Sequence, residues 1–350
     1  MPMKMGWRWY GEGNDPVTLS DIKQIPGVTS IVWALHNKMP GEIWEIDEIQ
    51  KVADQIHAYG FDMDVVESVN VHDDIKIGLP TRDKYIENYK QCIRNLSKFG
   101  VKVICYNFMP VFDWLRSELT RQNADGSNSL AYDDATVLNM NPLTSELSLP
   151  GWDESYTKEE LKDLLNQYKS VDEETLWKNL QTFLQAVIPV AEESGVKMAI
   201  HPDDPPWGLF GLPRIITCEK NLERFLKLVD SPANGLTFCT GSLGAGQFND
   251  LPAMARKFAD RIHFVHLRNI HWTGPKDFEE TGHPTSCGSL DMYAIVKALY
   301  EGGFDGYVRP DHGRMIWGET GRYGYGLYDR ALGATYIAGL WEAVERSHQE

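Results

Sequence analysis

Four residues with metal-ligand side chains each stand at or near the end of a short apolar stretch. They are His201 in "VKMAIHPDD", Cys239 in "GLTFCTGS", His266 in "IHFVHLRN" and Asp311 in "YVRPDHGR". Short apolar stretches that end in polar residues are typical of parallel strands whose carboxyl ends carry chemistry. Each residue alone is more often structural, but imidazole, thiolate and carboxylate groups that meet at one edge form a divalent-metal site. The four together therefore predict a metal centre.

Mixed nitrogen, sulfur and oxygen ligands do not distinguish among zinc, iron and manganese. Arg268 and Asn269 follow His266, and Arg309 and His312 flank Asp311. Several cationic groups near one metal, in a chain of net charge −16, predict a local site for an anionic substrate. Structural salt bridges are the alternative for each arginine. Trp9 lies on the first apolar stretch, and we expect its aromatic ring to contact the substrate. Packing of the ring in the core is the alternative interpretation.

The overall composition restricts the class of partner. Net charge is −16 and the pI is near 5.1. This charge would repel phosphate backbones and anionic lipids, so we expect neither nucleic acid nor membrane as a partner. No apolar run approaches the roughly 18 residues of a transmembrane helix. The five cysteines include no CxxC pair, which favours a reducing cytoplasm over a disulfide framework.

Eight strand-like stretches alternate with helical ones along the chain. The strands are predicted at 3–10, 29–35, 61–68, 101–108, 196–202, 235–242, 262–269 and 306–312. The helices are predicted at 44–59, 82–98, 173–194, 219–229, 248–259, 290–301 and 328–346. Eight β units that alternate with helices predict the α/β class and a (β/α)8 TIM barrel, with a doubly wound open sheet as the alternative.

We expect one barrel domain over 1–350 with a long insertion after strand four. Residues 109–171 have few regular signals and many turn-forming residues, such as "NADGSNS". A long irregular stretch in a compact domain is usually functional or disordered. It follows a strand on the catalytic face, so we interpret it as a lid or an interface arm. A variable surface insertion is an equal alternative.

Three segments, "MKMGWRWYG", "FVHLRN" and "RPDHGR", resemble mannonate dehydratases, and the resemblance runs over nearly the whole chain. It implies a xylose-isomerase-like TIM barrel that uses Mn²⁺ or Fe²⁺ and forms a homodimer. It implies a hydro-lyase that converts the sugar acid D-mannonate to 2-dehydro-3-deoxy-D-gluconate in glucuronate catabolism. It also implies that His201, Cys239, His266 and Asp311 bind the metal and that His312 and Tyr325 are the catalytic acid/base pair.

The residues leave two alternatives open. A sugar or sugar-acid isomerase or epimerase would share the metal and the barrel, although a cysteine ligand suits one metal better than a carboxylate-rich pair of metals. A barrel that only binds sugar acids would need no turnover. Which of His312 and Tyr325 removes the C2 proton, and which protonates the departing C3 hydroxyl, is not assigned by the sequence.

Overall fold

A closed barrel of eight parallel strands forms the centre of the molecule. The computed structural model describes residues 3–143 and 157–349. The strand order is β1-β12-β9-β8-β7-β4-β3-β2, and β1 pairs with β12 to close the barrel. The barrel strands are β1 (Lys4–Arg8), β2 (Val28–Trp33), β3 (Asp62–Glu67), β4 (Val103–Tyr106), β7 (Lys197–Ile200), β8 (Asn234–Cys239), β9 (Ile262–Leu267) and β12 (Tyr307–Pro310). The predicted TIM barrel is confirmed, and the open-sheet alternative is wrong because this sheet has no free edge.

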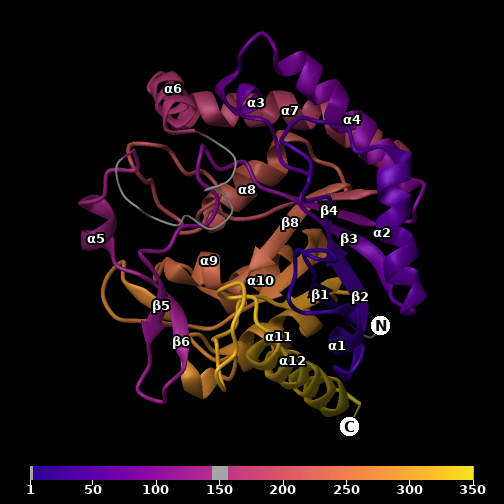
Figure 1. The fold of residues 1–350 in the computed structure, drawn as a ribbon, viewed down its shortest axis with the longest axis vertical. Helices are drawn as coiled ribbons and strands as arrows, with labels where there is room; N and C mark the ends of the chain where they lie inside the picture. The colour runs from indigo at the N-terminus through magenta and orange to yellow at the C-terminus, as the bar shows by residue number, and fades with distance from the viewer. Residues whose placement is uncertain (1–2, 144–156, 350) are drawn as a thin grey trace.

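Helices surround the barrel, with α2, α4 and α7 along the outside of β3 and β4 (Figure 1). The seven predicted helices each match an observed helix to within three residues at either end. Among the described residues, no helix is long and apolar enough to cross a membrane. The helices are α1 (Leu19–Ile22), α2 (Ile46–Ala58), α3 (Asp73–Ile77), α4 (Arg82–Ser97), α5 (Asp134–Leu138), α6 (Lys158–Tyr168), α7 (Glu173–Glu193), α8 (Glu219–Leu228), α9 (Thr240–Ala245), α10 (Leu251–Phe258), α11 (Met292–Glu301) and α12 (Tyr328–Ser347).

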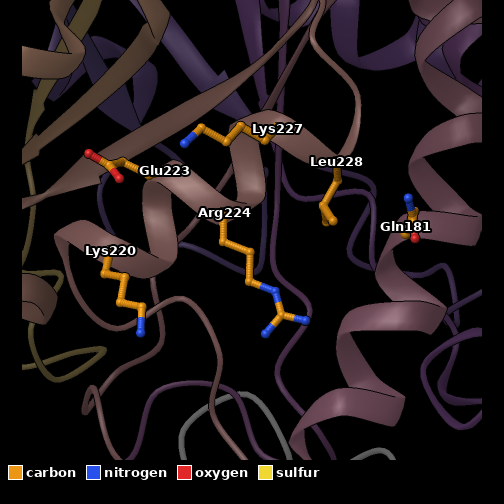
Figure 2. A pocket seen from close by; sticks show the side chains of 6 residues that line it. All are labelled: Gln181, Lys220, Glu223, Arg224, Lys227 and Leu228. Atoms are coloured by element: carbon orange, nitrogen blue, oxygen red, sulfur yellow. The ribbon is translucent and has the colours of Figure 1, made fainter.

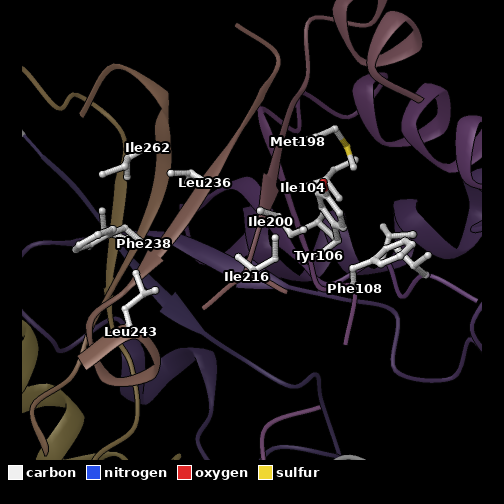
Figure 3. Packing of buried hydrophobic residues seen from close by; sticks show 14 of the residues in the cluster. Ile104, Tyr106, Phe108, Met198, Ile200, Ile216, Leu236, Phe238, Leu243 and Ile262 are labelled. Atoms are coloured by element: carbon white, nitrogen blue, oxygen red, sulfur yellow. The ribbon is translucent and has the colours of Figure 1, made fainter. Parts of the chain in front are cut away.

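The two faces of each barrel strand have different partners because side chains alternate along a strand. Outward residues such as Ile104, Met198 and Phe238 belong to the large hydrophobic layer outside the strands (Figure 3). A separate, smaller apolar cluster contains Val32, Val65, Val103, Cys105, Ala199, Phe264 and Tyr307, one or two from each of six strands. Because side chains alternate, the residues two positions after the members of this cluster on the same strands also face the barrel interior. The barrel interior therefore changes from apolar to polar toward the carboxyl ends of its strands.

A second sheet, with the order β10-β11-β6-β5, joins two segments that are far apart in sequence. Strands β5 (Glu118–Gln122) and β6 (Asn128–Tyr132) lie within the predicted insertion 109–171, whereas β10 (Ile270–Trp272) and β11 (Phe278–Glu280) follow barrel strand β9. The turn between β5 and β6 includes Gly126, whose φ of 84° suits glycine. The insertion thus has more regular structure than expected, while its part at 144–156 lies outside the described residues. Its role as lid or interface arm stays a prediction.

Replacing Phe183 by alanine is expected to lower the free energy of unfolding by about 3–5 kcal/mol. Phe183 on α7 is fully buried, and its ring contacts those of Tyr89, Tyr106 and Phe108. The change would therefore leave a cavity between α7 and the outer face of the barrel. Phe248 is 68% exposed, so Phe248→Ala is the matched control. Urea unfolding of both variants tests this, and equal midpoints would contradict it.

Candidate metal centre and active site

The four predicted metal ligands converge at the carboxyl ends of four neighbouring strands. His201 follows β7, Cys239 ends β8, His266 lies in β9 and Asp311 follows β12. His201 Nε2 lies 3.2 Å from His266 Nδ1, and Cys239 Sγ lies 3.4 Å from Asp311 Oδ2. His266 Nδ1 is 4.0 Å from Asp311 Oδ1, which joins the two pairs. Ligand atoms of His201, Cys239 and His266 all lie within 4.8 Å of one another, so these residues form a possible metal-binding group.

The contacts of the two histidines direct one ring nitrogen of each at this group. His201 Nδ1 lies 2.7 Å from the Pro202 carbonyl oxygen, to which it donates when it carries the ring proton. Its Nε2 then offers a lone pair, the arrangement common to metal-bound histidines. His266 Nδ1 faces the same group, 3.2 Å from His201 Nε2, whereas its Nε2 is buried without a hydrogen bond among the described residues, 3.5 Å from a Glu67 oxygen. His201 Nε2 and His266 Nδ1, together with the Cys239 sulfur, fit a divalent cation of intermediate softness.

Two guanidinium groups hold Asp311 in its ionised form. Arg309 Nη1 lies 2.8 Å from Oδ1, and Arg268 Nε lies 3.3 Å from Oδ2. Burial raises the pKa of Asp311, but the guanidinium charges of Arg309 and Arg268 outweigh burial and hold that pKa well below its ordinary value. The carboxylate is therefore negatively charged at neutral pH and suited to act as an oxygen ligand.

A second group of ligand-type side chains, Glu67, Cys105 and His266, shares one histidine with the first. Glu67 accepts hydrogen bonds from Arg309 Nη2 at 2.8 Å and from Nε at 3.0 Å. Burial raises the pKa of the Cys105 thiol well above its ordinary value, so this thiol is protonated. Arg309 also contacts Asp311, at 2.8 Å, so a cation at either carboxylate would compete with this guanidinium. The raised pKa of Cys105 opposes the thiolate form that binds a metal, and the first group is therefore the stronger candidate metal site.

The predicted acid/base pair is in direct contact beside the metal-ligand group. His312 Nε2 lies 3.0 Å from the Tyr325 hydroxyl and 3.9 Å from Asp311 Oδ1. The Trp114 ring lies 4.7 Å from the His312 ring, and the Tyr10 ring packs edge-on against Tyr325 at 4.9 Å. Burial raises the pKa of Tyr325 well above its ordinary value. Tyr325 is therefore a protonated phenol at neutral pH, able to donate a hydrogen bond to His312.

A groove of about 430 Å³ lies elsewhere, on the outer helical layer between α7 and α8 (Figure 2). Two of its charged side chains have partners of opposite charge: Arg224 donates to both oxygens of Glu174, and Glu223 pairs with Lys257. The groove contains no histidine or cysteine, being lined by Gln181, Lys220, Glu223, Arg224, Lys227 and Leu228. The strand ends therefore remain the candidate active site.

The sequence and the fold were each compared with known proteins. The family profile described as D-mannonate dehydratase (UxuA) matches residues 3–350. A mannonate dehydratase from Thermotoga maritima is 56% identical over 355 residues, covering 98% of each chain. The crystal structure of mannonate dehydratase from Streptococcus suis serotype 2 superposes with a TM-score of 0.93 at 47% identity, covering 99% of this chain and 96% of that one.

The chain belongs to the mannonate dehydratase family. The family resemblance noted in the sequence is thereby confirmed. A xylose isomerase domain protein from Planctomyces limnophilus has a TM-score of 0.58 at 14% identity, covering 98% of this chain and 99% of that one. At that identity the likeness shows the fold alone, and the fold is the xylose-isomerase-like TIM barrel expected from the family.

In this member of the family, both predicted substrate-binding arginines already bind carboxylates. Arg268 donates to Glu280 at 2.7 Å and to Asp204 at 2.9 Å, and Arg309 donates to both oxygens of Glu67. Helix α9 starts at Thr240, earlier than the predicted strand end at 242, and brings its backbone against Arg268. A Cβ on Gly241 would lie 1.9 Å from Arg268 Nε, so only glycine fits this approach. A substrate role for either arginine stays a prediction.

The other two predicted substrate-binding residues lie in packed surroundings. Trp9 is 3% exposed and belongs to the large hydrophobic cluster. Asn269 is fully buried: its Oδ1 accepts from the Ile270 and Leu290 amides, and its Nδ2 donates to the Pro284 carbonyl. These bonds connect the segment between β11 and α11 to the start of β10. Contact of either residue with substrate stays a prediction that no observed contact favours.

Several buried charged residues of the site were missed by sequence analysis, among them Arg116, Asp204 and Glu280. Arg116 donates to Asp204 at 2.8 and 3.0 Å and to Glu280 at 2.7 and 2.9 Å. The guanidinium charges of Arg268 and Arg116 overcome the effect of burial and lower the pKa of Glu280 to about 2. Asp204 follows the end of β7, as His201 does. The pattern of a polar residue after an apolar strand could therefore have identified Asp204 as well. Arg116 and Glu280 depend on the second sheet, for which the sequence had no signal.

Proposed function

We propose that this chain catalyses the dehydration of D-mannonate to 2-dehydro-3-deoxy-D-gluconate and water. The observation that carries the proposal is the contact between the metal-ligand group and the His312–Tyr325 pair, in a chain of the mannonate dehydratase family. The metal group is suited to an acidic substrate, and the adjacent pair is suited to proton transfer.

The reaction needs one base and one acid. The C2–H bond and the C3–O bond break, a C2=C3 double bond forms, and the displaced hydroxide takes a proton to become water. The resulting enol ketonises to the 2-keto product, so no redox cofactor is required. His312 and Tyr325 are the proposed proton-transfer groups, and the hydrogen bond between them allows a proton to move from one to the other.

The charges of the site favour a divalent cation together with a monoanionic substrate. Buried carboxylates and guanidinium groups of the site are already paired with one another: Asp204 and Glu280 with Arg116 and Arg268, and Glu67 and Asp311 with Arg309. A bound divalent cation would add two positive charges, which the Cys239 thiolate and one substrate carboxylate would balance. When bound, that cation would stabilise the negative charge that develops on the substrate carboxylate during C2 deprotonation.

Further details of the proposal rest on the family and on composition. We propose Mn²⁺ or Fe²⁺ as the metal, held by His201, Cys239, His266 and Asp311, and a homodimer as the assembly. We assign the reaction to glucuronate catabolism in the cytoplasm. The five cysteines are all free thiols, which suits a reducing compartment.

Turnover should depend strictly on the metal. Protein treated with a chelator is expected to lose activity on D-mannonate, and reloading with Mn²⁺ or anaerobic Fe²⁺ should restore formation of the 2-keto-3-deoxy acid. The product distinguishes the alternatives, because an isomerase or epimerase yields no deoxy acid. A folded, metal-loaded sample that forms none would contradict the proposal, as would full activity after chelation.

A further inference from the structure

We propose that Glu280 is a positioning residue that fixes the ring tautomer of His312, with the proton on Nδ1 and the lone pair of Nε2 directed at Tyr325. This inference rests on the proposed function, in which His312 and Tyr325 transfer protons. It assigns a role to a carboxylate that comes from the second sheet, outside the barrel strands.

The contacts around His312 form one continuous chain. Both carboxylate oxygens of Glu280 lie within hydrogen-bond distance of His312 Nδ1, at 2.9 and 3.0 Å. On the other side of the ring, Nε2 lies 3.0 Å from the Tyr325 hydroxyl. Glu280 and His312 are each 3% exposed and Tyr325 is 6% exposed, so water does not compete freely for these bonds. An ionised carboxylate accepts only, so Nδ1 must carry the proton for this contact to be favourable.

One contact acts against this tautomer. Arg268 Nη1 lies 2.6 Å from the same His312 Nδ1 and would donate to it if the proton sat on Nε2. That arrangement would place the Nδ1 lone pair against both oxygens of Glu280. Arg268 also donates to Glu280 itself and to Asp204, so its charge is satisfied without the histidine. The Glu280 carboxylate therefore determines the tautomer of His312, and Arg268 holds this carboxylate in place by donating a hydrogen bond to it.

The second sheet holds Glu280 rigidly enough for this role. Glu280 ends β11, which pairs with β10 on one side and with β6 of the insertion on the other. The ring of Phe278 stacks on Tyr132 of β6 at 5.6 Å. Arg116, just before β5, donates to Glu280 through two nitrogens and lies 4.9 Å above the Phe278 ring. One function of the insertion is thus to supply the residues that hold the Glu280 carboxylate in place.

Three variants test the role kinetically. Glu280→Gln keeps the shape but can present an amide N–H to His312 Nδ1, and it is expected to lower kcat by about 10²- to 10⁴-fold, as loss of an orienting carboxylate does elsewhere. KM should change little, because Glu280 does not contact substrate in this scheme. Glu280→Asp keeps the charge and should recover part of kcat. Glu279→Gln removes the same charge one residue earlier on β11 and should leave kcat unchanged.

A spectroscopic measurement tests the tautomer without any change at Glu280. Nitrogen NMR of the full chain with isotope-labelled histidine, loaded with diamagnetic zinc, identifies which ring nitrogen of His312 is protonated. The signal is assigned by its absence from His312→Gln protein. We expect the proton on Nδ1 in the wild type and a loss of that preference in Glu280→Gln. A proton on Nε2 in the wild type would overturn the proposal, whatever the variants do.

The two proposals can fail separately. If the wild type forms no deoxy acid from D-mannonate, the proposed function fails, while the tautomer is still measured. If the wild type is active and His312→Ala is not, but Glu280→Gln keeps normal kcat, the positioning role alone is wrong. If Glu280→Gln does not fold, the nitrogen NMR spectrum of the wild type still tests the proposed tautomer of His312.

Discussion

Replacing His312 by alanine is expected to lower kcat on D-mannonate by about 10²- to 10⁴-fold, the usual contribution of a positioned acid or base. Metal content should stay at the wild-type level, because His312 is not among the proposed ligands. Tyr325→Phe should have a similar effect, since it removes only the hydroxyl that bonds to His312 Nε2. Steady-state kinetics with metal analysis on the same samples separates lost chemistry from lost metal.

Matched controls are available for both changes. His271 is exposed on β10, and Tyr323 is 43% exposed two residues before Tyr325. His271→Ala and Tyr323→Phe should keep wild-type kcat. If His312→Ala or Tyr325→Phe does the same, that residue has no part in proton transfer. If His312→Ala loses metal as well as kcat, the residue belongs to the metal site instead, and the acid/base assignment is wrong.

The barrel and its strand-end residues were predictable because the signals are local. A strand has a period of two, so a polar residue two positions beyond a buried inward residue must also face inward. Phe264 and His266, or Ala199 and His201, illustrate this pattern. Convergence then follows from closure of the barrel, which brings together the carboxyl ends of strands that are distant in sequence.

The part of the site that the sequence did not predict depends on contacts that leave no local pattern in the sequence. Strand β11 has three residues, too short for any periodicity, and besides the nearby β10 it pairs with β6, which lies nearly 150 residues earlier in the chain. No local pattern therefore singled out Glu280 or Arg116. The sequence left open whether Arg268 and Arg309 bind an anionic substrate or form structural salt bridges, and in the structure both pair with carboxylates of the protein.

Replacing Cys239 by alanine is expected to weaken metal binding by more than about 100-fold, since loss of even an outer partner of a ligand costs about 10- to 100-fold. The thiolate is the softest ligand of the set, and its loss leaves two imidazoles and a carboxylate. Activity should fall in parallel with metal occupancy. Calorimetric titration of chelated protein with Mn²⁺, with metal analysis after dialysis, measures the change.

Cys105→Ala is the decisive comparison because Cys105 belongs to the second ligand group, with Glu67 and His266. If the metal occupies the group of Cys239, as the raised pKa of the Cys105 thiol favours, Cys105→Ala keeps the metal and Cys239→Ala loses it. Added Mn²⁺ should then raise the melting temperature of Cys105→Ala and of the wild type, but not of Cys239→Ala, because only a binding-competent native state gains stability from the ion. The reverse pattern would move the metal to Glu67, Cys105 and His266, and would require Arg309 to leave Glu67 when the ion binds.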